Sequence, residues 1–537
     1  MHTIGHRLNA LAATYGSDPA LIAADQLVSF ADLASDARRV ASALAALGVS
    51  KGTRVGILMP NNPDFLRCAF GAWRLGGIVV PINTLFRAAE LAYALRHADV
   101  SVLFLVSRFL RNHYLRMLVE HCPELAQSPA PLRSAALPCL RHVVCVGDDM
   151  PTGAIAWEDF LASGEAGSTP WSAAALDTVV AADDAAIFFT SGSTAAPKGV
   201  VHTHASMLQA ADNVADRLGL TAEDRTYGYL PLFFNGGMVG VALATLSRGG
   251  SVLLQEVFDA EETLRLLERH RCTTLFAWPH QAEALIRHPR FDRNALYIRK
   301  GPGANTKWAA ALFRPDHQAV GTWGMSETGP MASSSRWDDP LADRAGAHGR
   351  PMPGLELRIV DPDSNQPLPP DCEGEIVVRG SSLMRTYYKR DPAECFDAEG
   401  FFHTGDCGRV DGRGRLHFVG RIKDVIKTAG VNVAAAEIEA ALLQHPGVQV
   451  AHVVPVPHPT RGENVGAFVV RRDPRCSAAD LRSHCREALA SYKVPRHFFF
   501  VAEEELPTLG SGKVDRQALR VRAAELAAGE LAGGEEP

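Results

Sequence analysis

A run of small polar residues carries the most specific chemistry in the chain. It extends from Thr190 to Gly199 and reads TSGSTAAPKG. Small side chains let backbone N–H groups approach an oxyanion, hydroxyls donate hydrogen bonds, and Lys198 adds a positive charge, so the run suits a polyphosphate. It differs from the Walker loop, in which glycine, lysine and Ser/Thr follow one another. A flexible surface loop has a similar composition and is the alternative at this point.

This run resembles the phosphate-binding signature of the adenylate-forming superfamily, T-S-G-[ST]-T-G-x-P-K-G. It departs from that pattern at Ala195, where glycine is usual. The superfamily includes acyl- and aryl-CoA synthetases, the AMP-dependent synthetase and ligase type that the chain resembles. The resemblance implies that ATP is bound here by Thr190, Ser191, Gly192, Ser193, Thr194 and Lys198.

A second run, Gly321 to Gly329, resembles the superfamily motif Y-G-x-T-E, with Trp323 for tyrosine. The resemblance implies that Trp323 and Gly324 border adenine. It also implies that Ser326 donates to the α-phosphate and that Glu327 holds Mg²⁺. A nucleotide-bound Mg²⁺ needs only one or two carboxylates, because phosphates and waters complete its shell. Outside such a motif, a lone glutamate is usually a solvated surface residue.

Further motifs imply the remaining nucleotide contacts. Phe401 to Asp406 resembles [WF]-x-x-T-G-D, whose aspartate accepts hydrogen bonds from both ribose hydroxyls. In the motif G-R-x-K-[DE]-x-I-K, Arg421 contacts ribose and Lys423 is the hinge between two domains. Gly303 lies in a weaker match to S-G-[AG]-[AG]-P, a bend beside adenine. The aspartate and the glycine are also common in ordinary turns.

A lysine near the C-terminus completes the expected catalytic set. Leu506 to Lys513 matches the closing signature of the superfamily, whose lysine bridges the substrate carboxylate and the α-phosphate. The implied catalytic residues are Lys513, Glu327 and Ser326. Rotation about the hinge would withdraw Lys513 and present a thiol tunnel that includes Lys427 and Gly430. An exposed loop lysine is the alternative.

The acid-binding pocket is expected around Thr226 to Gly237, a stretch that in the superfamily ends in P-[LM]-F-H. Phe234 replaces that histidine, and Asn235 matches an asparagine that meets a ring hydroxyl in hydroxybenzoate-activating relatives. A turn residue is an equal interpretation of Asn235, and a core tryptophan is the alternative for Trp278. The expected pocket residues are Phe234, Asn235, Trp278, Gly301 and Thr322. An apolar or aromatic acid is favoured over an amino acid, because no carboxylate in this stretch could anchor an amino group.

These motifs together predict an ATP-dependent acid–thiol ligase. A carboxylate attacks the α-phosphorus of ATP, giving acyl-AMP and pyrophosphate, and the thiol of CoA then takes the acyl group and releases AMP. ATP, Mg²⁺ and CoA (as co-substrate) are the expected cofactors. A carrier-protein phosphopantetheine or another acceptor is the alternative to CoA. Departures at Ala195, Phe234, Pro302 and Ala435 also leave a catalytically silent nucleotide-binding protein as a third interpretation.

The elements that must position these residues alternate between helices and short apolar strands. Helical spacing from Phe30 to Leu47 is followed by a strand from Arg54 to Met59, and similar cycles follow. The alternation indicates an α/β fold, with parallel-rich sheets flanked by helices. We expect a large N-terminal adenylation domain at residues 1–422 and a small mobile α+β lid domain at residues 423–537. Residues 523–537 are expected to be a frayed tail.

Composition narrows the class of protein. The 537 residues are 47% hydrophobic and 21% charged, which is typical of a soluble globular protein. A formal net charge of -6 with interspersed signs argues against nucleic acid as a partner. No secretory signal or membrane span is visible, and scattered cysteines suit a cytoplasmic enzyme. The expected partners are a small-molecule carboxylic acid and CoA, with an acyl carrier protein as the alternative acceptor and a monomer or homodimer as the oligomeric state.

Overall fold

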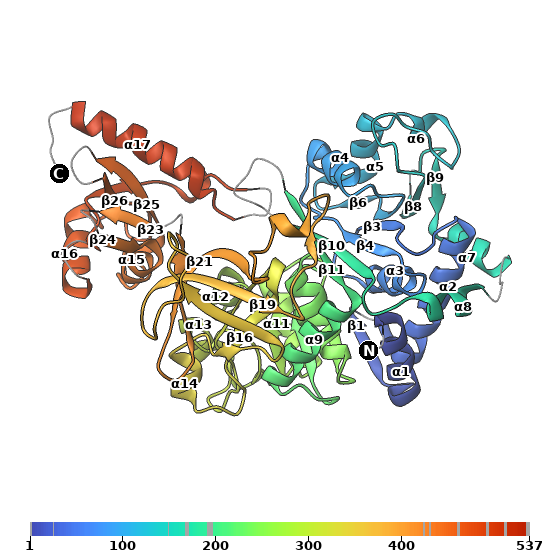
Figure 1. Ribbon diagram of the computed structural model, residues 1–537, viewed down its shortest axis with the longest axis horizontal. Coiled ribbons are helices and arrows are strands. Elements are labelled where there is room, and N and C mark those ends of the chain that lie inside the picture. The colour runs from blue at the N-terminus through green and yellow to red at the C-terminus, as the bar shows by residue number, and fades with distance from the viewer. Residues whose placement is uncertain are drawn as a thin grey trace. The chain divides into compact units, whose positions relative to one another are not determined.

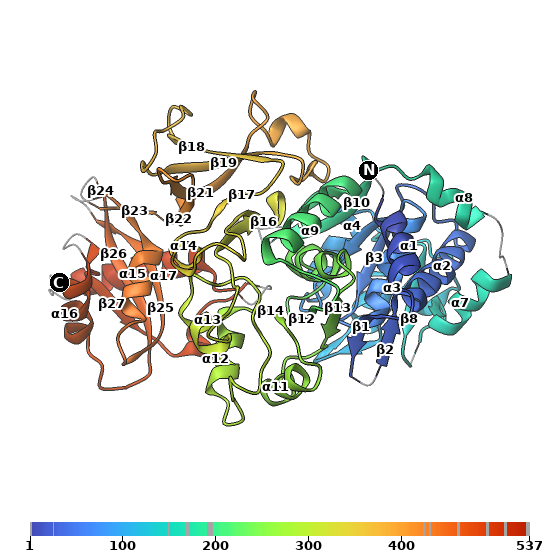
Figure 2. The same ribbon diagram turned by 90° about the horizontal axis from the view of Figure 1, so that it is seen from below.

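The chain divides into two compact units. The computed structural model describes residues 3–24, 26–148, 150–166, 171–190, 197–422, 425–428, 431–458, 462–489, 493–509 and 513–532. The larger unit is Met1–Leu357 with Val378–Phe402, and the smaller is Arg358–Val377 with His403–Pro537 (Figures 1 and 2). The hinge and domain boundary expected at Lys423 stay predictions, because Lys423 lies outside the described residues.

An eight-stranded sheet organises the larger unit (Figure 1). Its order is β20-β11-β10-β4-β3-β5-β8-β9. The neighbours from β10 to β9 run parallel, whereas β11 is antiparallel to both β10 and β20. The bounds are β3 (Arg54–Leu58), β4 (Ile78–Pro81), β5 (Val102–Val106), β8 (His142–Val146), β9 (Ala154–Ala156), β10 (Asp184–Thr190), β11 (Lys198–Thr203) and β20 (Thr386–Tyr387).

Helices cover both faces of this sheet, and Figure 1 shows β3 and β4 between them. One face packs on α2 and α3 through residues that include Phe188, and the other packs on α4 and α5 through residues that include Ile187. Strands buried on both faces must be apolar throughout, which explains the continuous runs in the sequence. The helices are α2 (Phe30–Ala46), α3 (Pro63–Arg74), α4 (Ala88–His97) and α5 (Tyr114–His121).

The expected phosphate loop joins two antiparallel strands. Thr190 ends β10, Lys198 begins β11, and the two residues are paired. Residues 191–196, which include Ser191, Gly192, Ser193 and Thr194, lie outside the described part of the chain. The pairing nevertheless holds the two ends of the loop next to each other in the antiparallel ladder of β10 and β11.

The helix after this loop is α9 (His204–Leu218), and His202 just before it still belongs to β11. β-branched Val200 and Val201 favour the strand. Thr203 then caps the helix, since its hydroxyl accepts a hydrogen bond from the Ser206 N–H at 3.1 Å.

A second sheet of the larger unit has the order β14-β12-β13-β1-β2, with β2 as its antiparallel edge strand. α9 and η1 (Gly236–Leu243) contribute to the same apolar cluster as α2 and α3. The bounds are β1 (Pro19–Ala23), β2 (Gln26–Ser29), β12 (Arg225–Gly228), β13 (Ser251–Leu254) and β14 (Thr274–Phe276).

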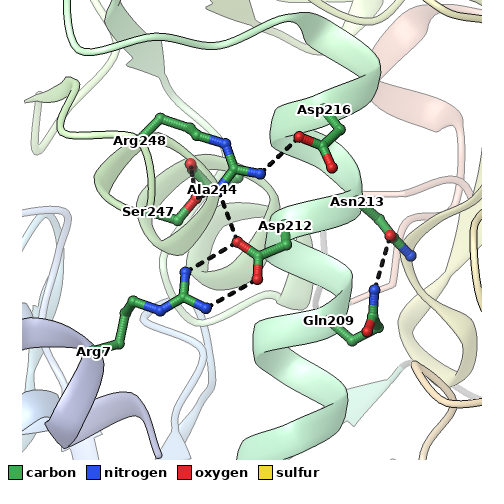
Figure 3. A network of polar contacts seen from close by, with 8 residues as sticks. All are labelled: Arg7, Gln209, Asp212, Asn213, Asp216, Ala244, Ser247 and Arg248. Carbon is green, nitrogen blue, oxygen red and sulfur yellow. Dashed lines mark hydrogen bonds and ion pairs between the residues drawn. The ribbon is translucent and has the colours of Figure 1, made fainter. Parts of the chain in front are cut away.

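Ion pairs fasten α9 to its neighbours (Figure 3). The Asp212 carboxylate accepts hydrogen bonds from both terminal nitrogens of Arg7 at 3.0 Å each and from Arg248 at 3.0 Å. Arg248 also donates to Asp216 at 2.7 Å. Bidentate arginine–carboxylate geometry of this kind is directional, so it fixes the helix at the surface of the core.

A small sheet of three strands carries the second sequence motif. It consists of β15 (Thr322–Met325), β16 (Gly329–Ser334) and β17 (Arg350–Pro351), in that order. The connection from β15 to β16 is a single 3₁₀ turn, η2 (Ser326–Thr328). Gly329 ends the turn with a φ of 86°, a conformation that favours glycine.

The smaller unit is α+β. One sheet has the order β18-β19-β21-β22, and another has the order β24-β23-β26-β25, with β27 added beside β26. α15 and α16 pack on one face of the second sheet and α17 on the other (Figure 1). The bounds are β18 (Leu355–Val360), β19 (Gly374–Gly380), β21 (Phe402–Val410), β22 (Leu416–Arg421), β23 (Val425–Thr428), β24 (Val431–Ala434), β25 (Val448–His458), β26 (Gly462–Arg471), β27 (His497–Phe500), α15 (Ala435–Leu442) and α16 (Ala478–Ala488).

The expectation of a frayed tail from residue 523 is wrong for its first part, because α17 (Arg516–Ala532) continues through it. Leu519, Ala523 and Ala527 recur at one-turn intervals and are buried against the sheet. Two of the three are alanines, so the apolar stripe is weak in the sequence even though it is buried in the fold.

The predicted α/β fold, with a large N-terminal part and a smaller C-terminal part, is confirmed. None of the helices in the described residues combines the length and the apolar content needed to cross a bilayer. Other α-helices in the described ranges are α1 (Ile4–Tyr15), α6 (Glu124–Gln127), α7 (Trp157–Ala166), α8 (Trp171–Thr178), α10 (Ala244–Leu246), α11 (Ala260–Arg269), α12 (Pro279–Arg287), α13 (Lys307–Leu312) and α14 (Leu341–Ala345).

Candidate active site

The Ser326–Thr328 turn lies at the centre of the candidate site in the larger unit. The N–H of Met325 donates to the Thr328 hydroxyl at 3.1 Å, which closes the turn on itself. The Glu327 side chain is only 6% exposed. A buried carboxylate requires partners, because an uncompensated charge away from water is very unfavourable.

Tyr387 supplies one such partner and links the turn to the phosphate lysine. Its hydroxyl donates to Oε1 of Glu327 at 2.9 Å. Nζ of Lys198 lies 4.8 Å from the centroid of the same Tyr387 ring, a cation–π distance. Tyr387 stands on β20, which pairs with β11, so the two predicted ATP residues meet at one side chain that the sequence did not single out.

The backbone of the turn is held from a second side. The Ser326 carbonyl accepts hydrogen bonds from Nε2 of His202 at 2.7 Å and from Nδ2 of Asn235 at 3.0 Å. Both side chains are buried. Burial lowers the pKa of His202 to about 4, although its bond to the Ser326 carbonyl acts in the opposite direction, so the imidazole is neutral.

Aromatic side chains from two segments converge next to Asn235. The ring centroids of Phe233 and Phe234 are 4.6 Å apart, and that of Trp278 lies 6.2 Å from Phe234. His280 follows, with its ring 5.7 Å from Trp278. The predicted pocket residues Phe234 and Trp278 are therefore neighbours in an apolar wall, and the predicted pocket residue Asn235 follows Phe234 in the chain.

The other two predicted pocket residues lie on adjacent backbone segments. Pro302 forms a parallel bridge with Val320, which brings the segment of Gly301 beside the segment that leads to Thr322. Gly303 N donates to the Val320 carbonyl at 2.9 Å. A Cβ at Gly301 would lie 2.2 Å from the carbonyl oxygen of Leu275, so this close approach requires glycine.

Trp323 and Gly324 flank the turn on β15. The Trp323 side chain is 6% exposed and packs inside the unit, whereas Gly324 faces solvent. A Cβ at Gly324 would lie 2.8 Å from the Pro330 carbonyl oxygen, so the strand crosses its partner closely there. Contact of Trp323 with adenine stays a prediction.

In the smaller unit, the two residues predicted to bind ribose contact each other. Nε of Arg421 lies 2.7 Å from Oδ1 of Asp406, and Asp406 is 4% exposed. Thr404 accepts a hydrogen bond from the Asp406 N–H at 3.1 Å and so fixes the start of this segment. Glu375, which the sequence did not single out, accepts from the Gly405 N–H at 2.9 Å.

Lys513 belongs to the same unit. Its carbonyl accepts a hydrogen bond from the Leu509 N–H at 2.7 Å, and the neighbouring Thr508 and Val514 form an antiparallel bridge. The side chain as a whole is exposed. The surroundings of its ammonium group lower the pKa of Lys513, chiefly by desolvation and then through the positive charge of Arg421. Arg421 therefore contacts Asp406 directly and acts on Lys513 through its charge.

Gly430 and the hinge Lys423 lie outside the described residues, as do the loop residues named above. Lys427 lies on β23, with the backbone of that strand paired to β24. Among the described residues, no group of three or more His, Cys, Asp or Glu side chains is arranged to hold a metal ion. A single carboxylate with nucleotide phosphates is nevertheless an ordinary Mg²⁺ environment, and Glu327 fits it.

Comparison with known proteins identifies the family. A family model described as AMP-binding enzyme matches residues 8–388, and one described as AMP-binding enzyme C-terminal domain matches residues 437–513. The chain belongs to the AMP-binding enzyme family. The similarity to adenylate-forming enzymes that the motifs indicated is therefore confirmed for both parts of this AMP-binding enzyme.

Individual relatives of this AMP-binding enzyme are ligases of different acids. The sulfoacetate–CoA ligase of Cupriavidus necator is 33% identical, over 96% of this chain and 97% of that protein. The feruloyl-CoA synthase of an Amycolatopsis species is 33% identical, over 92% of this chain and 94% of that protein. An anthranilate CoA ligase, solved in complex with anthranoyl-AMP, has a TM-score of 0.83 at 26% identity, covering 98% of both chains.

Proposed function

We propose that this AMP-binding enzyme is an ATP-dependent ligase that joins an apolar or aromatic carboxylic acid to CoA through an acyl-adenylate. The observation that carries the proposal is the meeting of Lys198 and Glu327 at Tyr387, together with the contact between Arg421 and Asp406 in the smaller unit. The family and the CoA ligases among the relatives support it.

In the first half-reaction, a carboxylate oxygen of the acid attacks the α-phosphorus of ATP. The bond from that phosphorus to the bridging oxygen breaks, and pyrophosphate leaves. Both reactants are anions, so the protein acts mainly by positioning and by placing positive charge and donors in advance. Lys198 would attract the outer phosphates, the Ser326 hydroxyl would donate to the α-phosphate, and Lys513 would bridge the two reacting anions.

Two further groups of the site would hold the nucleotide. Glu327 would hold Mg²⁺, which when bound supplies neutralisation of the phosphate charge. Asp406 would accept hydrogen bonds from the ribose hydroxyls, with Arg421 in contact with its carboxylate and orienting it. Lys513 would supply positive charge to the reacting anions.

In the second half-reaction, the sulfur of CoA attacks the acyl carbon, the bond from that carbon to the phosphate oxygen breaks, and AMP leaves. No cysteine of the chain is required for this step. We propose that rotation about Lys423 withdraws Lys513 and presents Lys427 and Gly430 to the thiol, as in other enzymes that assemble two sites by domain movement. A carrier-protein phosphopantetheine is the alternative acceptor.

The acid is proposed from the pocket of this chain, because its relatives act on acids as different as sulfoacetate and ferulate by name. Phe234 and Trp278 offer an apolar wall, which suits an aryl or alicyclic body. Such walls discriminate weakly between similar acids, so Asn235 is the group most able to select one with a hydrogen-bond donor.

The test is pyrophosphate release with a panel of fatty, aryl and alicyclic acids, with and without CoA, combined with chromatography of the thioester. We expect acid-dependent pyrophosphate release and acyl-CoA formation with at least one aryl or alicyclic acid. Formation of the acyl-adenylate without transfer of the acyl group to CoA would favour a carrier-protein phosphopantetheine as the acceptor. ATP binding without pyrophosphate release from any acid would contradict the proposal.

A further inference from the structure

Two segments that are distant in the sequence donate hydrogen bonds to the Ser326 carbonyl, in the candidate catalytic turn. Nε2 of His202, on β11, lies 2.7 Å from this oxygen, and Nδ2 of Asn235, at the start of η1, lies 3.0 Å from it. The two side chains are 1% and 3% exposed. Hydrogen bonds that are buried this completely do not compete with water, and loss of one donor leaves the carbonyl under-satisfied.

Because the acceptor is a carbonyl oxygen, it determines the tautomer of His202 and the orientation of the Asn235 amide. A carbonyl oxygen only accepts, so Nε2 of His202 must carry the proton and Asn235 must turn its NH₂ group toward the turn. The other imidazole nitrogen, Nδ1, lies 3.2 Å from the Ser206 hydroxyl, which can donate to it. Each polar atom of the imidazole therefore has a partner in one neutral tautomer.

The turn itself has little intrinsic rigidity. It is a three-residue 3₁₀ turn, whose hydrogen-bond geometry is poorer than that of an α-helix. The Ser326 carbonyl belongs to the peptide that continues into the Glu327 N–H, so holding this oxygen fixes the plane from which both side chains emerge. On the far side, the Glu327 carbonyl accepts from the Met384 N–H at 2.8 Å.

β11 carries both His202, which holds the turn, and Lys198, the predicted phosphate-binding lysine. Lys198 and His202 are four residues apart on one strand, so they lie on the same face. The strand is paired on both sides, with β10 and with β20, and cannot shift independently of the sheet. One strand therefore carries both Lys198 and His202, the residue that contacts the Ser326 carbonyl.

We propose that His202 and Asn235 are positioning residues, which hold the Ser326–Glu327 peptide so that the Ser326 hydroxyl and the Glu327 carboxylate face the nucleotide and its Mg²⁺. The inference rests on the proposed function, because it takes this turn to be the one that meets the nucleotide. His202 is the cleaner residue to test, since Asn235 also borders the aromatic wall of Phe234.

The experiment compares three variants of the full-length enzyme. His202→Leu removes the donor, and His202→Gln replaces it with an amide that can reach the same oxygen. His204→Leu is the matched control, because His204 is equally buried in the same unit but accepts a hydrogen bond from the Ile4 N–H at 3.4 Å and does not touch the turn.

The first readout needs no catalysis. Amide hydrogen exchange of residues 325–329, without nucleotide, should accelerate about 5- to 100-fold in His202→Leu, the factor expected for loss of one buried hydrogen bond. It should be near wild type in His202→Gln and in His204→Leu. Unchanged exchange in His202→Leu, or equal acceleration in the His204→Leu control, would overturn the proposal.

The second readout separates nucleotide from acid. With an acid that wild type accepts, His202→Leu should lower kcat/KM for MgATP by about 10- to 100-fold, leave KM for the acid within about twofold, and be rescued largely by His202→Gln. A rise confined to the KM of the acid would overturn the positioning role. A wild-type enzyme inactive with every acid would contradict the proposed function instead, while the exchange measurement would still decide the role of His202.

Discussion

The hydroxyl of Tyr387 donates to Oε1 of Glu327 at 2.9 Å, while the face of the same ring lies 4.8 Å from Nζ of Lys198. One side chain thus touches the proposed Mg²⁺ carboxylate and the proposed phosphate lysine. Its two contacts differ in kind: the hydroxyl makes the first and the ring makes the second. Removing the hydroxyl oxygen of Tyr387 therefore abolishes the first contact and leaves the second.

Tyr387→Phe should keep the cation–π contact and lose the hydrogen bond. Bonds to a charged group contribute roughly 1.5–3 kcal/mol, so we expect kcat/KM for MgATP to fall about 10- to 100-fold and the Mg²⁺ concentration for half-maximal rate to rise. Pyrophosphate release against Mg²⁺ concentration measures both. Tyr388→Phe, which loses a 3.0 Å bond to Asp99, is the control. Equal effects in the two variants would show that Tyr387 has no special relation to Glu327.

Buried histidines should make the fold sensitive to mild acid. Burial lowers the pKa of both His202 and His204 from 6.5 to about 4. Between these values the unfolded chain takes up protons that the folded chain does not, so stability falls as the pH falls from about 6.5 to about 4. The slope is about 1.4 kcal/mol per pH unit for each histidine.

Urea unfolding at several pH values would measure how the free energy of unfolding changes with pH. His204→Gln should reduce this slope by the contribution of one histidine, about 1.4 kcal/mol per pH unit. A carboxylate such as Asp32, whose pKa is lowered by hydrogen bonds from Ser29, loses its contribution only near or below its ordinary value of 3.8, outside this range. An unchanged slope in His204→Gln would contradict the assignment.

Lys300 and Asp224 form a buried ion pair, with Nζ and Oδ2 2.7 Å apart and side chains 6% and 0% exposed. Lys300→Met should destabilise the larger unit by about 3–5 kcal/mol, because buried Asp224 loses its near cation and keeps only the half-exposed Arg299, 3.8 Å from Oδ1. The double variant Lys300→Met/Asp224→Asn should recover part of that loss. Chemical denaturation gives both values, and Arg287→Ala, from an exposed pair, should change stability by less than about 0.5 kcal/mol.

Much of the fold could be predicted because burial leaves a strong pattern. Strands covered on both faces, such as the one containing Ile187 and Phe188, are apolar throughout. β11 was not expected, since a strand that begins with lysine and glycine has no such run. The end of α17 was not expected either, because its buried stripe is mainly alanine, whose small side chain gives little periodic signal.

The candidate site was predictable where chemistry lies in contiguous motifs, as for Glu327 and Lys513. Tyr387, His202 and Glu375 contact site residues that are distant in the sequence and become neighbours only in the folded chain. Each is a single residue outside any recognisable motif. A histidine inside the β-branched run of β11 is the one signal that could have indicated His202, because a polar ring at a buried strand position needs a partner.

The central claim is that one lysine of the smaller unit serves adenylate formation and not thioester formation. The decisive measurement is therefore Lys513→Ala in both half-reactions: pyrophosphate release from acid and ATP, and acyl-CoA formation from a supplied acyl-adenylate and CoA. We predict a loss of about two to three orders of magnitude in the first and a rate near wild type in the second. Equal losses in both half-reactions would contradict the account.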